Sequence, residues 1–234
     1  MRPVVKGDTP KEADNITDKT CSPYSNAKDD LAETIGDYCS FCETWGYSSS
    51  IALEHVQAKK YKENDIEIYA HLEEVWDNFL LACVHCNSIK GSTNVILNNY
   101  HLPHLTNTFK SIDYGQGGIV ATAVALNGNA QELLKVNNLI SLVGLDRRPG
   151  KPNYSRKDRR WKNRRAAWEL AEKYLMKYNN GNADVDTICD LASLRGFWSI
   201  WMKIFENEQV VKTALTQTFL GTFVQCETTD ISRH

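Results

Sequence analysis

The sequence predicts an α+β fold, and three observations support that prediction. Two strand-like segments accompany two Cys-x-x-Cys pairs within the first hundred residues. A glycine-rich bend at 115–118 lies between segments that favour strands, which is typical of a β-hairpin. From residue 128 onward the apolar periodicity is helical. We therefore expect a small core of two strands and one helix, then a hairpin and a mainly helical C-terminal region.

The first elements follow from local signals. Residues 1–24 are polar and contain three prolines, which predicts an extended arm. The stretch 26–35, NAKDDLAETI, predicts a short capped helix. Segment 50–56, SIALEHV, reads as a strand. In 76–87, WDNFLLACVHCN, a second short strand runs into a turn and places Asn87 near the start of a helical turn.

The remaining elements follow in chain order. The hairpin is expected within 109–126, FKSIDYGQGGIVATAVAL. Four helices are predicted after it, at 128–144, 155–179, 184–207 and 208–220. The tail ETTDISRH, 227–234, is expected to be frayed.

This order predicts three parts of the chain. Residues 1–36 form an N-terminal arm and a short helix, 37–98 form the core that carries the cysteine pairs, and 99–234 form the hairpin and helical region. The chain contains no run of eighteen apolar residues, and its first residues, MRPVVKGDTPKEADN, lack the apolar segment of a secretion signal. We expect a cytoplasmic protein without membrane contact.

The cysteines predict a metal site. There are seven, and an odd number without a secretion signal argues against a disulfide framework. Two residues between paired thiolates suit one zinc ion at about 2.3 Å. A thioredoxin-like redox pair needs a βαβ context that neither pair has. We therefore expect one structural, coordinatively closed zinc site, with chance spacing as the remaining alternative, held by Cys39, Cys42, Cys83 and Cys86.

Polar residues between and just after the pairs suggest hydrolytic chemistry. At the end of the first strand, Glu54 and His55 can both reach one small site if the backbone turns there. A histidine with a pKa near neutrality can deprotonate water. Glu54 and Asn87 offer the hard oxygen ligands that Mg²⁺ or a similar divalent ion prefers. Such an ion would polarise a scissile phosphate and offset the charge on the leaving oxygen.

The order of these motifs resembles the HNH endonucleases and their ββα-metal fold. The matching residues are Cys39-x-x-Cys42, Glu54-His55, Asn78, Cys83-x-x-Cys86-Asn87 and Lys90-Gly91. The resemblance implies that His55 is the general base, that Glu54 and Asn87 bind the catalytic ion, and that Asn78 braces the loop carrying the base. Many members have histidine where this chain has Asn87, so the preferred metal is left open.

More narrowly, the chain resembles the HNH proteins of Septu anti-phage systems and related retrons. The similar segments include GDYCSFC, LEHV, NFLLACVHCNSIKGS, SLVGLDR and FLGT. The resemblance implies a nuclease of antiviral defence that acts beside a PtuA-like ABC-type ATPase, and in retrons beside a reverse transcriptase and its msDNA. Whether the substrate is DNA or RNA, including tRNA, is left open.

Structural alternatives remain for each catalytic candidate. Glu54 and His55 could be an ordinary pair at a strand end. Asn78 could cap a turn, and Asn87 could cap the following helix without binding a metal. In that case the chain would be a non-catalytic, zinc-stabilised module that binds nucleic acid or a protein partner.

Positive charge is concentrated in one segment. Residues 147–165 hold ten basic side chains and one acidic side chain, a balance of +9, while the whole chain has a net charge of −2. This pattern predicts phosphate contacts, with docking to an acidic protein as the alternative. Trp161 and Trp168 fit an apolar helical stripe better than base-stacking platforms. The predicted nucleic-acid contacts are Lys90, Arg156, Arg159, Arg160 and Arg164.

Overall fold

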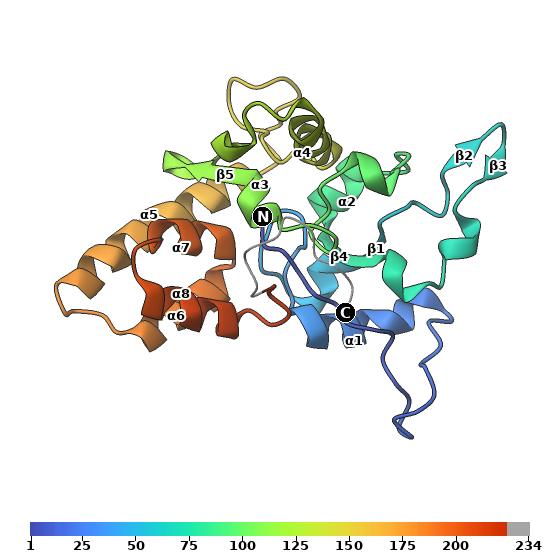
Figure 1. Ribbon diagram of the computed structural model, residues 1–234, viewed down its shortest axis with the longest axis horizontal. Coiled ribbons are helices and arrows are strands. Elements are labelled where there is room, and N and C mark those ends of the chain that lie inside the picture. The colour runs from blue at the N-terminus through green and yellow to red at the C-terminus, as the bar shows by residue number, and fades with distance from the viewer. Residues whose placement is uncertain (224–234) are drawn as a thin grey trace.

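Two antiparallel strands form the centre of the computed structural model, which describes residues 1–223 (Figure 1). Strand β1 (Ile51–His55) pairs with β4 (Phe79–Cys83), and helix α2 (Val84–Lys90) follows β4 directly. The predicted α+β class and the unit of two strands and one helix are confirmed. The tail at 227–234, for which fraying was predicted, lies outside the described residues.

Apolar sequence explains why this unit is buried. The first four residues of β4, Phe-Leu-Leu-Ala, are almost completely buried, as expected for a short continuous apolar strand. Helix α1 (Ala27–Ile35) packs against β4, and its Leu31 and Ile35 are fully buried on one face. The helix predicted at 26–35 is therefore present, but the Asn26 side chain makes no capping hydrogen bond, so the predicted cap was wrong.

The segment between the two strands carries a small exposed hairpin that the sequence analysis did not resolve. Its strands are β2 (Lys62–Glu63) and β3 (Ile66–Glu67). The turn residues Asn64 and Asp65 both have positive φ, at 51° and 64°, which is the geometry of a two-residue type I′ turn. Short 3-10 turns flank these elements: η1 (Tyr24–Asn26), η2 (Ser48–Ser50), η3 (Ala70–Leu72) and η4 (Trp76–Asn78).

The second predicted hairpin is also present. Helix α3 (Thr108–Ser111) leads into β5 (Ile112–Gly115), which pairs with β6 (Ile119–Thr122). A Cβ atom on Gly118 would lie 2.8 Å from the backbone nitrogen of Arg165. The bend therefore needs glycine to approach helix α5 (Arg160–Asn179). Further 3-10 turns are η5 (Leu97–Asn99), η6 (Gln116–Gly118) and η7 (Val124–Leu126).

Five helices complete the described chain, and two of the predictions for them were wrong. Helix α4 (Ala130–Leu142) and helix α8 (Gln209–Thr218) lie within their predicted ranges. Helix α5 (Arg160–Asn179) begins five residues later than predicted, because the Asp158 side chain accepts from the backbone nitrogen of Arg160 and starts the helix there.

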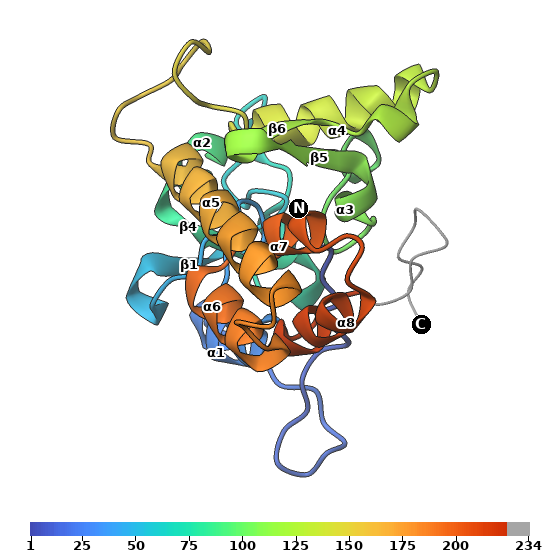
Figure 2. The same cartoon turned by 90° about the vertical axis from the view of Figure 1, so that its left-hand side faces the viewer.

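The helix predicted at 184–207 is two helices. They are α6 (Val185–Arg195) and α7 (Trp198–Ile204), and they are separated by Gly196 and Phe197 with φ of 72° and 61°. A right-handed helix cannot continue through left-handed residues. The break lets α6 pack on α8 and α7 pack on α5, and Figure 2 shows these helices gathered on one side of the molecule.

The N-terminal residues are less extended and less exposed than predicted. Met1 and Val4 are fully buried, and Val4 forms a bridge with Thr222. The Arg2 guanidinium donates to the carbonyls of Leu220 and Ile35, each at 2.6 Å. The first residues therefore join α1 to the end of α8, while the loop at 11–18 remains largely exposed.

Across residues 1–223 no helix combines the length and the apolar character that crossing a membrane would require.

Candidate functional site

The two Cys-x-x-Cys pairs converge on one point. The sulfur atoms of Cys39, Cys42, Cys83 and Cys86 all lie within 4.8 Å of one another, and Cys42 Sγ is 3.6 Å from Cys83 Sγ. Zinc–sulfur bonds of about 2.3 Å in a tetrahedron place sulfur atoms roughly 3.8 Å apart. The four cysteines therefore form a cluster that could hold a zinc ion, and it is the only such group of metal-ligating side chains within residues 1–223.

Local structure brings the two pairs together. The first pair lies in a turn closed by a hydrogen bond from the Cys39 nitrogen to the Thr44 carbonyl at 3.0 Å. The Ser40 nitrogen donates to the Leu81 carbonyl at 2.8 Å, which attaches this turn to β4. The second pair spans the end of β4 and the first turn of α2.

Two donors outside the pairs point at the sulfurs. The Thr44 hydroxyl lies 3.2 Å from Cys42 Sγ, and the Arg160 guanidinium lies 3.1 Å from Cys86 Sγ. Burial raises the pKa of the Cys39 and Cys86 thiols. A cation beside a buried thiolate compensates for part of that cost, so Arg160 completes the electrostatic environment of the cluster.

The side chain of His55 is held at the end of β1. Its Nε2 donates to the Glu73 carbonyl at 2.8 Å, and its ring packs edge-on against Tyr24 and Phe79. A carbonyl can only accept, so this bond fixes the proton on Nε2 and leaves the lone pair on Nδ1. Burial lowers the pKa of His55, which keeps the imidazole neutral near pH 7.

Asn78 ties the loop after β1 to the start of β4. Its amide oxygen accepts from the Gln57 nitrogen at 2.8 Å, and its amide nitrogen donates to the carbonyls of Gln57 and Leu72 at 3.1 and 3.2 Å. The Val56 nitrogen also donates to the Asn78 carbonyl at 2.8 Å. These bonds hold the loop beside His55 against the start of β4, and the role of Asn78 in catalysis stays a prediction.

Glu54 lies on β1 and is paired with α2. Its Oε1 is 2.7 Å from the Lys90 ammonium, and both side chains are buried. Lys90 also donates to the His55 carbonyl at 2.7 Å. Burial raises the pKa of Glu54, and the neighbouring Lys90 partly opposes that rise. The second oxygen of Glu54 makes no hydrogen bond within residues 1–223.

Asn87 lies on α2, one helical turn before Lys90, and is half-buried. Its side chain makes no hydrogen bond in the described part of the chain, so it does not cap the helix. Because Lys90 binds both Glu54 and the backbone of His55, the helix that carries Asn87 is fixed against the end of β1. The structure thus holds Glu54, His55 and helix α2 together through Lys90.

The predicted phosphate contacts divide into two groups. Arg156 and Arg159 are exposed, and their role stays a prediction. Lys90, Arg160 and Arg164 are at most 5% exposed. For these three the prediction of nucleic-acid contact was wrong, because their charged groups are buried beside protein acceptors and do not reach a phosphate at the surface.

The buried arginines connect α5 to preceding segments. Arg160 donates to both oxygens of Asp158 and to the carbonyls of Val143 and Gly144. Arg164 donates to the Gly118 carbonyl at 2.6 Å and to the Leu145 carbonyl at 3.1 Å.

Sequence reasoning missed three contributors to this region. The Glu73 backbone orients His55, Lys90 neutralises Glu54, and Arg160 contacts the cysteine cluster. The only signal for any of them was the Lys90-Gly91 pair that follows the second Cys-x-x-Cys pair. A backbone carbonyl carries no sequence signature, and basic side chains usually indicate a surface.

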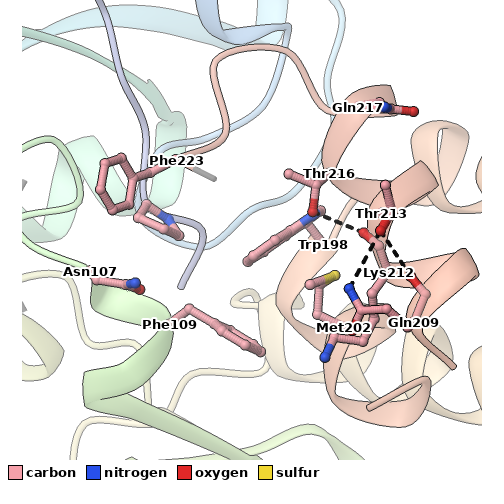
Figure 3. A pocket seen from close by; sticks show the side chains of 11 residues that line it. Asn107, Phe109, Trp198, Met202, Gln209, Lys212, Thr213, Thr216, Gln217 and Phe223 are labelled. Atoms are coloured by element: carbon pink, nitrogen blue, oxygen red, sulfur yellow. Dashed lines mark hydrogen bonds between the residues drawn. The ribbon is translucent and has the colours of Figure 1, made fainter. Parts of the chain in front are cut away.

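An apolar hollow lies apart from these residues. It has a volume of about 500 Å³ and lies between the α3 region and helices α7 and α8. Figure 3 shows Phe109 and Phe223 on one side of it, with Trp198 and Met202 on the other. None of the candidate catalytic or metal-binding residues lines it.

Comparison with known proteins adds no assignment. No model of a known protein family matches the sequence, and no curated protein matches it.

Proposed function

We propose that this chain is a metal-dependent HNH endonuclease that hydrolyses phosphodiester bonds in nucleic acid, and that it serves anti-phage defence together with an ABC-type ATPase. The single observation that carries the enzymatic part is the state of His55. Its Nε2–H bond to the Glu73 carbonyl fixes the tautomer with a free Nδ1, burial lowers its pKa, and it lies beside Glu54 and the helix of Asn87. The defence role and the ATPase follow from the family resemblance alone.

The general base in this proposal is the Nδ1 atom of His55. A neutral imidazole accepts a proton from a water molecule that attacks the phosphorus, and its Nε2–H bond to the Glu73 carbonyl stabilises the imidazolium that results. Asn78 keeps the loop beside this ring in place. The ring packing against Tyr24 and Phe79 restricts the imidazole to one orientation.

The remaining donors fit a divalent ion. The free oxygen of Glu54 and the amide oxygen of Asn87 are hard ligands of the kind that Mg²⁺ prefers, and neither is used in a hydrogen bond within residues 1–223. When bound, such an ion would polarise the scissile phosphate. The cysteine cluster is proposed to hold a structural zinc that keeps both segments of the site in register.

One observation favours a second function. The carboxylate of Glu54 already has an internal cation, Lys90, at 2.7 Å, and a buried ion pair of this kind needs no metal to be stable. This ion pair therefore supports a second function, in which the chain is a zinc-stabilised module that binds nucleic acid or a protein partner without cutting.

Nicking of supercoiled plasmid in the presence of Mg²⁺ separates the two functions. We expect His55→Ala to lose at least about a hundredfold in rate, because general-base catalysis contributes roughly 10²–10⁴-fold. Zinc content and the circular dichroism spectrum should stay as in the wild type. The control is His85→Ala, which removes an exposed histidine next to the cluster.

Cleavage by His55→Ala at the wild-type rate would exclude His55 as the base. Absence of Mg²⁺-dependent cleavage by the wild type on plasmid, single-stranded DNA and RNA, with and without the ATPase, would favour the non-catalytic module.

A further inference from the structure

A second hollow lies on the basic segment, away from the candidate catalytic residues. Its volume is about 550 Å³, which is within the usual range for ligand sites. It is formed by the tip of the β5–β6 hairpin, the turn at 148–149 and one face of α5. Its walls carry Trp161 of the basic segment and Trp168 just after it, together with Gln116, Gly117, Ile119, Arg148, Pro149, Arg165, Glu169 and Glu172.

Trp168 forms an apolar part of this wall. The residue is only 7% exposed, and its indole Nε1 is covered by protein atoms, so the N–H does not open into the hollow. The ring therefore offers a ligand apolar surface and no hydrogen bond.

Three other groups in the hollow are free for a ligand. Trp161 lies two helical turns before Trp168, is half-buried, and stacks on no other ring in the described chain. The Arg148 guanidinium and the Glu172 carboxylate form no hydrogen bond or ion pair within residues 1–223. Arg165, by contrast, is already paired with a neighbouring glutamate, at 2.7 Å.

We propose that this hollow binds one unpaired base of a single-stranded stretch of nucleic acid. Trp161 stacks on the base, the Trp168 ring forms the apolar wall beside it, and Glu172 accepts from an exocyclic amino group. Arg148 contacts the adjacent phosphate. Aromatic stacking beside a basic surface is the usual means of holding single strands, and residues 147–165 supply a charge of +9.

This inference rests on the proposed function, because it specifies the substrate as nucleic acid that is locally single-stranded. It does not depend on cleavage. Binding can therefore be measured in the full chain carrying His55→Ala, which cannot cut the probe if the proposed mechanism holds and which leaves the hollow unaltered.

The test measures fluorescence anisotropy of labelled single-stranded DNA and RNA of about 12 nucleotides, and of the matching duplexes. We expect Trp161→Ala to weaken single-strand binding about tenfold, since stacking on one aromatic side chain contributes roughly 1–3 kcal/mol. Duplex binding should change less than twofold in this variant.

The matched control is Trp198→Phe. Trp198 is a tryptophan that lines the other hollow (Figure 3). Its replacement should leave single-strand binding unchanged. Equal losses in Trp161→Ala and Trp198→Phe would indicate a general effect on the fold and would overturn the assignment.

Salt dependence separates stacking from phosphate contact. Arg148→Ala should reduce the slope of log Kd against log salt by about 0.7, the value for one phosphate of a single strand, whereas Trp161→Ala should leave the slope unchanged. An unchanged slope in Arg148→Ala would show that Arg148 does not contact a phosphate.

Three results would overturn the proposal. The first is single-strand affinity that is unaffected by Trp161→Ala. The second is a mononucleotide that binds as tightly as the oligonucleotide, which would assign the hollow to a free nucleotide. The third is that neither the oligonucleotide nor the mononucleotide binds, while an acidic protein does. Loss of binding together with normal Mg²⁺-dependent nicking of plasmid by Trp161→Ala would support this site independently of the catalytic one.

Discussion

Individual residues show that charge in this protein is used inside the fold as well as on its surface. Lys90, Arg160 and Arg164 are buried, and each is surrounded by carbonyl oxygens or acidic partners. Burying a cation is costly unless its donors are satisfied. Acceptors of the chain lower that cost for all three residues, although Arg164 Nη1 has no acceptor within residues 1–223. For Arg160, burial lowers the pKa but its bond to Asp158 outweighs that effect, so the pKa rises and the guanidinium stays charged.

The Lys90–Glu54 ion pair gives a prediction at this scale. Lys90→Met retains most of the side-chain volume but leaves the Glu54 carboxylate buried without a partner. We expect a loss of about 3–5 kcal/mol in the free energy of unfolding, measured by urea denaturation, because that is the usual cost of removing one partner of a buried pair.

A double-mutant cycle provides the control. Glu54→Gln in the Lys90→Met background removes the unpaired charge, so the double variant should be more stable than Lys90→Met alone. If the two single losses simply add, the two side chains are not energetically coupled and the ion pair has no structural importance.

Among the secondary-structure elements, the break between α6 and α7 has the largest effect on the fold. Gly196 has φ of 72°, and a Cβ atom there would lie 2.5 Å from the Glu43 carbonyl oxygen and 2.7 Å from the Trp45 nitrogen. The glycine therefore allows the backbone of the helical region to reach the turn that holds the first cysteine pair. The Phe197 nitrogen then donates to the Glu43 carbonyl at 2.9 Å.

Gly196→Ala should consequently destabilise the protein by about 3 kcal/mol or more, since it combines backbone strain with a clash against backbone atoms. The matched control is Gly181→Ala, where φ is 69° and nothing lies within 4 Å of the added Cβ atom. That variant should lose only the strain of about 1–2 kcal/mol. Equal losses in the two variants, measured by thermal unfolding, would show that the close approach at Gly196 is unimportant.

These elements also show what the sequence could and could not predict. Periodicity and turn residues were sufficient for β1, β4, the β5–β6 hairpin and most helices, because those signals act over a few residues. The break after Arg195 depends on a contact with Glu43, about 150 residues earlier in the chain, so only an isolated glycine within a helical pattern hinted at it. The late start of α5 depends likewise on Asp158 and the carbonyls that bind Arg160.

The candidate site likewise has features that the sequence predicted and features that depend on folding. Spacing alone predicted the cysteine cluster, because two short loops of fixed length must present four thiolates to one point. The Glu54 partner and the His55 orientation were not predictable, since both depend on atoms brought close by folding. Net positive charge correctly marked residues 147–165 as distinctive, but it could not distinguish exposed Arg156 from buried Arg164.

At the scale of the whole molecule, the cysteine cluster connects parts of the chain that are distant in sequence. It joins the turn after α1 to the β4–α2 junction, and Arg160 extends the connection to α5. The buried apolar cluster likewise includes residues from the N-terminal stretch, the central strands and the C-terminal helices. Loss of the metal should therefore affect the helical region as well as the small core.

We predict that Cys83→Ser, or removal of zinc by a strong chelator, lowers the free energy of unfolding by on the order of 5 kcal/mol. For a chain of this size the melting temperature then falls by about 10–20 °C. Zinc measured by mass spectrometry should fall from one ion per chain to none, and helical circular dichroism should decrease in the same transition. Cys189→Ser, which alters a buried cysteine outside the cluster, should keep its zinc. A zinc-free protein that melts at the wild-type temperature would show that the cluster does not stabilise the fold through a metal.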